Sequence, residues 1–195
     1  MNPKLCTALL VLLAPTGLTA AEWHMLPATS KLEFEGTSQG SAFQGRFGKF
    51  SPRIVFDASK PASASFDVSI DLASAGTDNS ERDEALPGKD FFWVEKHPRA
   101  RFTAKACKPS VAAGQFECAG ALSLRGKSVP IRFRFAWKGD ARLAKLTSNV
   151  ALDRLDYDIG AGEWSDSTTL AHEVTVRIAL DLRATPPPLP SPAQR

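Results

Sequence analysis

Apolar and polar side chains alternate with a period of two residues through most of this 195-residue chain. In residues 65–72, Phe66, Val68 and Ile70 alternate with serine and aspartate, and residues 131–137 read Ile-Arg-Phe-Arg-Phe-Ala-Trp. Such alternation is typical of β-strands that bury one face. It recurs in enough short runs to predict eight or nine strands over about 160 residues.

One segment, residues 78–95, lacks this alternation. Its charged side chains crowd around a few apolar ones, and Asp78 or Asn79 followed by Glu81 is typical of a helix start. The Pro87-Gly88 pair interrupts a helix, so the segment is predicted to form two short helices.

The fold class predicted from these patterns is all-β. Many strands with one apolar face each, and almost no helix to cover them, form either a sandwich of two sheets or a closed antiparallel barrel. A barrel removes the exposed strand edges that promote aggregation, but alternation of the two faces suits both architectures. The hydrophobic content of 43% and charged content of 23% are ordinary values for one globular domain.

The two ends of the chain differ from the middle. Residues 1–21 combine Lys4, an apolar run over residues 5–14 and small residues at 18–21, which is the layout of a secretory signal peptide. The apolar run has half the length of a membrane-spanning helix, so we expect an exported protein that does not span the membrane. Residues 22–183 then form the domain, and the proline-rich residues 184–195 are predicted to be a disordered tail.

Two cysteines remain after removal of the signal peptide. Cys107 and Cys118 flank a turn-like stretch, and export into an oxidising compartment favours a disulfide between them. The alternation places the two side chains on opposite faces of their strands. The bridge therefore requires a β-bulge, which we expect at Gly120.

The sequence contains no familiar catalytic motif and no metal-binding motif. The three histidines, His24, His97 and His172, are far apart and have no partner at ligand spacing. The acidic residues around Gly160 and Gly162 do not follow the spacing of a calcium loop. We therefore expect no catalytic residue and no metal. The net charge of +3 is too small to argue for nucleic-acid binding.

The order of short motifs resembles the YceI family of secreted lipid-binding proteins. The most specific motifs are Asp-Phe-Phe at residues 90–92 and His-Pro-Arg-Ala-Arg-Phe at residues 97–102. The other matching stretches are residues 43–47, 54–57, 68–74, 120–131 and 152–164. The chain departs from the family pattern at Thr29-Ser30, at Pro87-Gly88 and in its two cysteines.

The resemblance implies an eight-stranded, lipocalin-like antiparallel barrel with a short helical segment between strands. Its tunnel would hold a polyisoprenoid or an isoprenoid quinone, with no other cofactor and no enzymatic activity. A polar head group would lie at the mouth near Arg82, Asp90 or Tyr157, and a quinone would suggest a membrane electron-transfer protein as partner. The residues expected to line the tunnel are Phe34, Phe43, Phe47, Phe56, Phe66, Val68, Ile70, Leu86, Phe91, Phe92, Phe102, Leu122, Leu124, Ile131, Phe133, Phe135, Trp137 and Val176.

Two other functions are consistent with the same sequence. A barrel filled by its own side chains would serve as an interaction or stress-response module without a lipid. An enzyme acting on an apolar substrate in the tunnel would need titratable side chains on the inward face, and the strand alternation supplies none. A hollow interior would distinguish the lipid-binding protein from the filled module.

Overall fold

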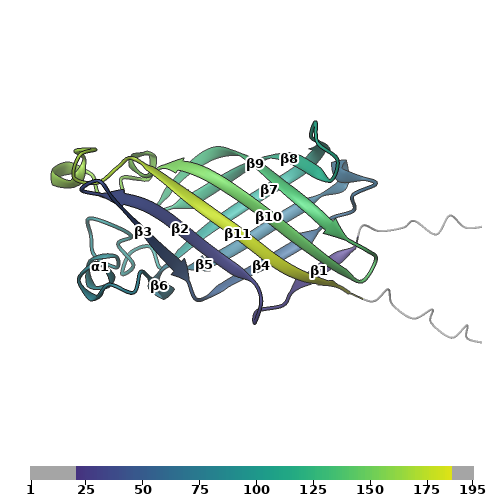
Figure 1. Cartoon of the computed structure of the whole chain (residues 1–195), viewed down its shortest axis with the longest axis horizontal. Helices are drawn as coiled ribbons and strands as arrows, with labels where there is room; N and C mark the ends of the chain where they lie inside the picture. The colour runs from purple at the N-terminus through teal and green to yellow at the C-terminus, as the bar shows by residue number, and fades with distance from the viewer. Residues whose placement is uncertain (1–20, 186–195) are drawn as a thin grey trace, which may run out of the picture.

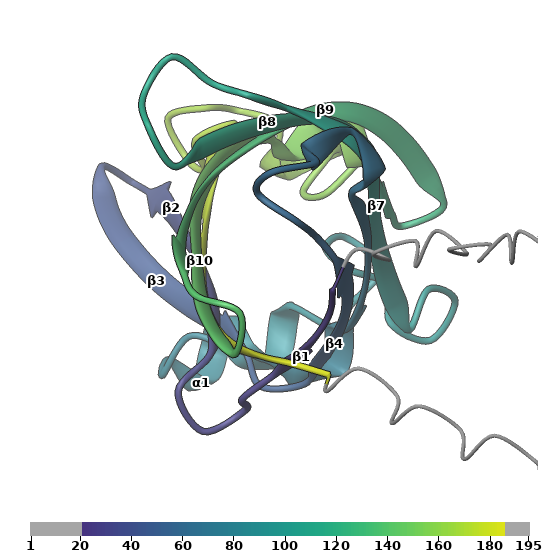
Figure 2. The same ribbon diagram turned by 90° about the vertical axis from the view of Figure 1, so that its right-hand side faces the viewer.

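The structure, a computed structural model, describes residues 21–185 and consists of one closed antiparallel β-barrel. This architecture confirms the barrel and excludes the sandwich (Figures 1 and 2). The predicted signal peptide, apart from Ala21, and residues 186–195 of the predicted tail lie outside the described residues.

The strands follow one another around the barrel with mostly short connections. They are β1 (Glu22–Met25), β2 (Lys31–Ser38), β3 (Ser41–Phe47), β4 (Phe50–Val55), β5 (Ser65–Asp71), β6 (Ala75–Gly76), β7 (Arg99–Pro109), β8 (Gln115–Leu124), β9 (Lys127–Gly139), β10 (Leu143–Asp153) and β11 (Glu173–Ala184). The helices are α1 (Ser80–Ala85) and the 3-10 turns η1 (Pro61–Ser63), η2 (Leu72–Ser74), η3 (Arg154–Tyr157) and η4 (Gly162–Trp164).

The eleven strand segments make an eight-stranded wall because two of its strands are interrupted. β1 and β2 both pair with β11, while β3 pairs with β2 and β4 pairs with β1. β1 and β2 are therefore two parts of one long wall strand, and β3 and β4 are two parts of its neighbour. β6 adds only a two-residue pairing with β3. The pairing of β1 with β11 closes the barrel.

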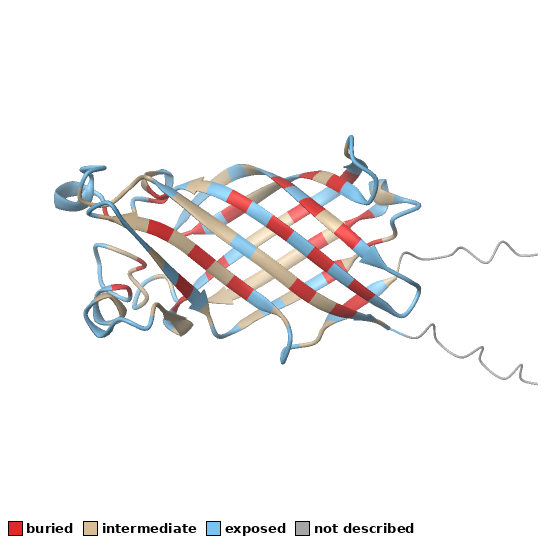
Figure 3. Ribbon diagram, in the orientation of Figure 1, coloured by how far each residue is buried: buried red, intermediate tan, exposed pale blue. Residues whose placement is uncertain are grey.

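The alternation in the sequence becomes an inner and an outer face of the wall. In β10, Ala144, Leu146, Ser148 and Val150 are buried, while the residues between them are exposed. Figure 3 shows the same alternation of buried and exposed positions along the strands. Burial of the inward apolar side chains stabilises the barrel by about 25 cal/mol for each Å² removed from water.

One end of the barrel interior is filled by aromatic side chains. The ring of Phe56 is fully buried, and its centroid lies 4.9 Å from that of Phe116, 5.3 Å from that of Phe135 and 4.7 Å from that of Trp137. Trp23 packs edge-on against Trp137, and its indole N–H donates a hydrogen bond to the carbonyl of Phe56. We call these five residues the aromatic cluster.

A disulfide joins Cys107 and Cys118 beside this cluster, but the bulge that permits it lies elsewhere than expected. The pairing of β7 with β8 shifts between Lys105 and Lys108, where Ala106 adopts a positive φ of 52°. That extra residue rotates Cys107 to the buried face. Gly120 stays in register, and its missing side chain leaves room for the ring of Phe102, which lies 2.7 Å from where a Cβ would be.

The helical segment forms only one of its two predicted helices. α1 begins after Asn79, whose side chain accepts a hydrogen bond from the backbone N–H of Arg82. Residues beyond Leu86 form turns, in which the N–H of Phe92 donates to the carbonyl of Leu86 and Trp93 has a φ of 48°. Pro87 has no N–H to donate, so the helical hydrogen-bond pattern ends there. Within residues 21–185, no helix is both long enough and apolar enough to cross a membrane.

Candidate functional site

A cavity of about 490 Å³ occupies the barrel between the aromatic cluster and the end that carries α1. Its size falls within the range of about 300–1,000 Å³ that is usual for small-molecule sites. The wall is supplied by side chains from most of the strands, by α1 and by the loops that follow α1 and β10. The interior is therefore filled at one end and hollow at the other.

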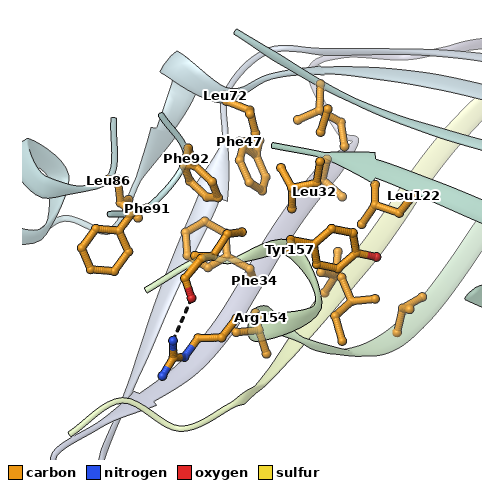
Figure 4. Close-up of a pocket in the computed structure, with 18 of the residues that line it drawn as sticks. Leu32, Phe34, Phe47, Leu72, Leu86, Phe91, Phe92, Leu122, Arg154 and Tyr157 are labelled. Atoms are coloured by element: carbon orange, nitrogen blue, oxygen red, sulfur yellow. Dashed lines mark hydrogen bonds between the residues drawn. The ribbon is translucent and has the colours of Figure 1, made fainter. Parts of the chain in front are cut away.

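Most residues predicted to line a tunnel do line this cavity. They are Phe34, Phe43, Phe47, Phe66, Val68, Ile70, Leu86, Phe91, Phe92, Phe102, Leu122, Leu124, Ile131, Phe133 and Val176. Those on strands come together because the inward faces of β2, β3, β5, β7, β8, β9 and β11 meet inside the closed wall, and Leu86, Phe91 and Phe92 come from the segment after α1. Figure 4 shows Phe34, Phe47 and Phe92 around the hollow.

Phe56, Phe135 and Trp137 do not line the cavity, although they were included in the predicted tunnel. They face inward as expected, but they belong to the aromatic cluster. On β9, Ile131 and Phe133 reach the cavity, whereas the next two inward residues lie further along the strand, where rings from several strands meet. These three side chains therefore point inward as predicted, but they lie at a different height along the barrel from the cavity.

Other lining residues were absent from the prediction. Those on the wall, which follow the same alternation and could have been found from it, include Leu32, Phe50, Ile54, Leu146, Val150, Leu152, Val174, Ile178 and Leu180. Leu72, which continues the alternation of β5, also lines the cavity. Those in the connecting segments, which have no periodic signal, include Arg154, Ile159, Trp164 and Leu170.

The two loops over the hollow end are joined to each other. The backbone N–H of Gly160 donates to the carbonyl of Asp90 at 2.6 Å, and the rings of Phe91 and Trp164 lie 5.7 Å apart. The Arg125 guanidinium donates to the carbonyls of Lys89 and Asp158. These contacts hold the two loops as one cover, which we call the cap (residues 86–97 and 154–172).

Arg154 organises the second loop of the cap. It is 3% exposed, and its Nε, Nη1 and Nη2 atoms donate to the carbonyls of Ala171, Ile159, Gly160, Trp164 and Leu170. Figure 4 shows the Arg154 guanidinium with one of these hydrogen bonds. Burial lowers the pKa of the guanidinium from its ordinary value. All five N–H groups of an arginine are used by these carbonyls, so Arg154 has none left for a ligand.

Tyr157 ends η3 just beyond Arg154 and is 1% exposed. Its ring lies in the cavity wall with the hydroxyl on the side of Leu122, and that hydroxyl has no hydrogen-bond partner within the described residues (Figure 4). Burial, together with the nearby charge of Asp156, raises the pKa of Tyr157 to about 12. The hydroxyl therefore stays protonated and neutral at ordinary pH, as a free donor.

The mouth of the cavity has a small set of polar side chains. Asn79, Glu81 and Arg82 of the α1 segment take part in the lining, and the Arg82 guanidinium lies 4.2 Å from the centroid of the Phe43 ring. Of the three positions expected near a head group, Arg82 and Tyr157 line the cavity and Asp90 does not.

The lining suits binding of an apolar molecule. Within residues 21–185 its side chains are mainly aliphatic or aromatic, and its titratable members are Glu81, Arg82, Arg154 and Tyr157. Across residues 21–185, no three His, Cys, Asp or Glu side chains gather in a way that could hold a metal ion.

Comparison with known proteins places this fold and cavity in a family. Residues 23–182 match the family model described as the YceI-like domain. A UPF0312 protein of Pseudomonas putida (strain W619) is 28% identical over 142 residues, covering 70% of this chain and 73% of that protein. A UPF0312 protein of Shewanella denitrificans is 29% identical over 134 residues, covering 67% and 70% respectively.

Solved structures share the architecture. BcnA of Burkholderia cenocepacia matches with a TM-score of 0.77 at 25% identity, covering 80% of this chain and 98% of BcnA. A domain from Saccharophagus degradans matches with a TM-score of 0.65 at 17% identity, covering 86% and 99%, which shows the same fold. Because the family model spans most of the sequence, from the first strand of the barrel to the last, this chain belongs to the YceI family.

Proposed function

We propose that this protein is a non-enzymatic lipid-binding protein that holds a polyisoprenoid or isoprenoid-quinone chain inside the barrel. The observation that carries the proposal is the cavity of about 490 Å³, whose wall is mainly apolar. Burial of an isoprenoid chain there gains about 0.8 kcal/mol for each methylene-sized group, before the cost of ordering the chain. Few polar anchors are needed for such a ligand.

A relative supports this choice of ligand class. The matching Saccharophagus degradans structure is described as a polyisoprenoid-binding domain implicated in plant cell wall breakdown. At 17% identity the likeness supports the ligand class only together with the apolar cavity of this chain. The filled-barrel module, by contrast, would require side chains throughout the lumen.

The proposal includes export to the periplasm and no resident cofactor other than the lipid. Its support is the signal-peptide layout of residues 1–21 and the pair of cysteines, which suits an oxidising compartment. If the ligand is a quinone, a membrane electron-transfer protein is the natural partner, since quinones carry electrons.

The test is to identify lipids that co-purify with the full chain. The protein is produced in a bacterial host with its leader, purified without detergent, and analysed by native mass spectrometry and organic extraction. We expect a mass adduct that extraction identifies as an isoprenoid lipid. A protein that repeatedly carries no lipid, and binds none when isoprenoids are added, would contradict the proposal.

Adjacent positions on β10 provide a matched pair of variants. Val150 faces the cavity, and its neighbour Ala151 is exposed on the outer face. Val150→Trp should fill the hollow and abolish the adduct, whereas Ala151→Trp should retain it. Equal lipid content in the two variants would show that the lipid binds somewhere other than the cavity.

A further inference from the structure

The Tyr157 hydroxyl is the exception among the buried polar groups of the described chain. Every other buried side-chain nitrogen or oxygen in residues 21–185 has a hydrogen-bond partner, but this hydroxyl has none. Buried polar groups in native proteins are nearly always paired, so an unpaired one calls for an explanation. In a cavity wall, a ligand atom is a natural partner.

The surroundings of the hydroxyl restrict what that atom can be. Tyr157 packs in a cluster with Phe34, Leu86, Phe92 and Leu122, which offer no polar group. The adjacent Arg154 has all of its N–H groups bound to backbone carbonyls. An anionic group placed beside Tyr157 would therefore be desolvated without a cation to donate to it, whereas an uncharged oxygen needs only one donor.

The position of Tyr157 along the barrel gives the ligand a direction. On β10, Leu146 lies opposite Trp137 of the aromatic cluster, and Leu152 is nearer the cap. Tyr157 follows the end of this strand and belongs to the cap. A head group at Tyr157 would thus leave the length of the cavity, from Leu152 to Leu146, for an apolar chain.

We propose that Tyr157 is a specificity-determining residue whose hydroxyl donates a hydrogen bond to an uncharged carbonyl oxygen of the ligand head group, as in a quinone ring. The apolar chain then extends towards the aromatic cluster. This inference rests on the proposed lipid-binding function and specifies the head group and orientation of the ligand. A phosphate head group would instead favour Arg82 at the mouth, where a guanidinium is available.

The test compares three probes that share a geranylgeranyl-length chain: a benzoquinone, a monophosphate and the saturated hydrocarbon phytane. Each is bound to delipidated wild-type protein and to Tyr157→Phe, which removes only the hydroxyl. We expect Tyr157→Phe to weaken binding of the quinone by about five- to tenfold and to leave the other two unchanged. Phe133→Leu, which reshapes the cavity wall without changing any polar group, should affect all three probes alike.

Two spectroscopic readouts report the hydrogen bond itself. The quinone carbonyl stretch should move to lower frequency on binding to the wild type, relative to its position in Tyr157→Phe. Tyr157 is the sole tyrosine of the chain, so fluorotyrosine labelling gives one fluorine signal that should respond to the quinone and not to phytane.

The outcomes separate this inference from the function on which it rests. Equal binding of the quinone by wild type and Tyr157→Phe, with no carbonyl shift, would overturn the role of Tyr157 and leave lipid binding intact. If Tyr157→Phe weakened binding of the monophosphate alone, the proposal of an uncharged head group would be wrong. If no probe bound the wild type, both the inference and the proposed function would fail.

Discussion

The two ends of the barrel are built from the same strands but have opposite interiors. At one end, Phe56 is surrounded on several sides by the rings of Phe116, Phe135 and Trp137. At the other end, the inward side chains of the same wall surround a hollow of about 490 Å³ that the cap covers. Strand β9 contributes to both ends, with Phe133 at the cavity and Phe135 in the cluster.

This difference shows that the hollow depends on where large rings converge and not on how many the chain contains. Eight strands enclose a lumen that side chains can just fill. Rings from β1, β8 and β9 meet with Phe56 at one height and fill it, and Trp23 is fixed there by its hydrogen bond to the Phe56 carbonyl. Nearer the cap, rings such as those of Phe34 and Phe92 stand around the wall beside aliphatic side chains such as Val150, and space remains open between them.

The largest expected effect comes from the same truncation made at each end. Phe56→Ala should lower the free energy of unfolding by about 3–5 kcal/mol, because it creates a cavity in a filled region. Phe92→Ala should cost about 1–2 kcal/mol, because its ring already borders a hollow and its removal enlarges existing space. Denaturant unfolding of both variants measures the difference, and equal losses would show that the two ends are packed alike.

The disulfide should stabilise the filled end without affecting the hollow one. Replacing Cys107 and Cys118 together by alanine removes a crosslink between residues eleven apart, for which loop closure predicts a loss of about 3 kcal/mol in the free energy of unfolding. Denaturant unfolding of the double variant, with reduced wild type as a reference, measures it. Lipid content should stay unchanged, and a loss of lipid would mean that the two ends are coupled.

Tyr157 gives the hollow end a distinctive response to alkaline pH. Its folded-state pKa is raised to about 12, whereas an unfolded tyrosine titrates near about 10, so the folded protein keeps this proton longer. The contribution of neutral Tyr157 to the free energy of unfolding is therefore fully present below pH 10. It is lost as the pH rises to 12, at up to about 1.4 kcal/mol for each pH unit.

Ultraviolet titration of this single tyrosine, together with unfolding of Tyr157→Phe as the control, checks this prediction. The difference in stability between wild type and variant should change over this pH interval. A folded-state titration at the ordinary tyrosine pKa would show that solvent reaches the hydroxyl.

The smallest expected effect lies on the outer face of the wall. Asp67 and Arg101 form an exposed pair with 2.7 Å between the Oδ2 and Nη2 atoms, and the hydrogen bonds from Arg101 lower the pKa of Asp67. Asp67→Asn should cost less than about 1 kcal/mol near pH 7. The depressed pKa means that this contribution is present above the unfolded pKa of about 4 and is lost as the pH falls, so the two proteins should converge in acid. A larger loss in the free energy of unfolding would show that this exposed ion pair stabilises the barrel more than surface pairs usually do.

Several features of the site can be predicted from the sequence pattern. Alternation along β5 and β9 identified the inward faces, including Phe66, Val68 and Phe133. The sequence also predicts a helix start at Asp78 or Asn79, because a capping side chain acts within one turn of backbone, and the structure shows Asn79 as the cap. The sequence predicts the bulge at Gly120, but the structure has it at Ala106. The position at which the register shifts depends on contacts between strands, which the local sequence does not show.

The sequence by itself determined an all-β chain, the residues that face inward and the resemblance to the YceI family, because strand periodicity and short motifs are local properties. Only the tertiary structure decided which inward residues fill the lumen and which surround a cavity. That distinction depends on the heights at which strands bring their side chains together across the barrel. It also placed Tyr157, in a turn without periodicity, inside the apolar wall, where its hydroxyl has no hydrogen-bond partner among residues 21–185.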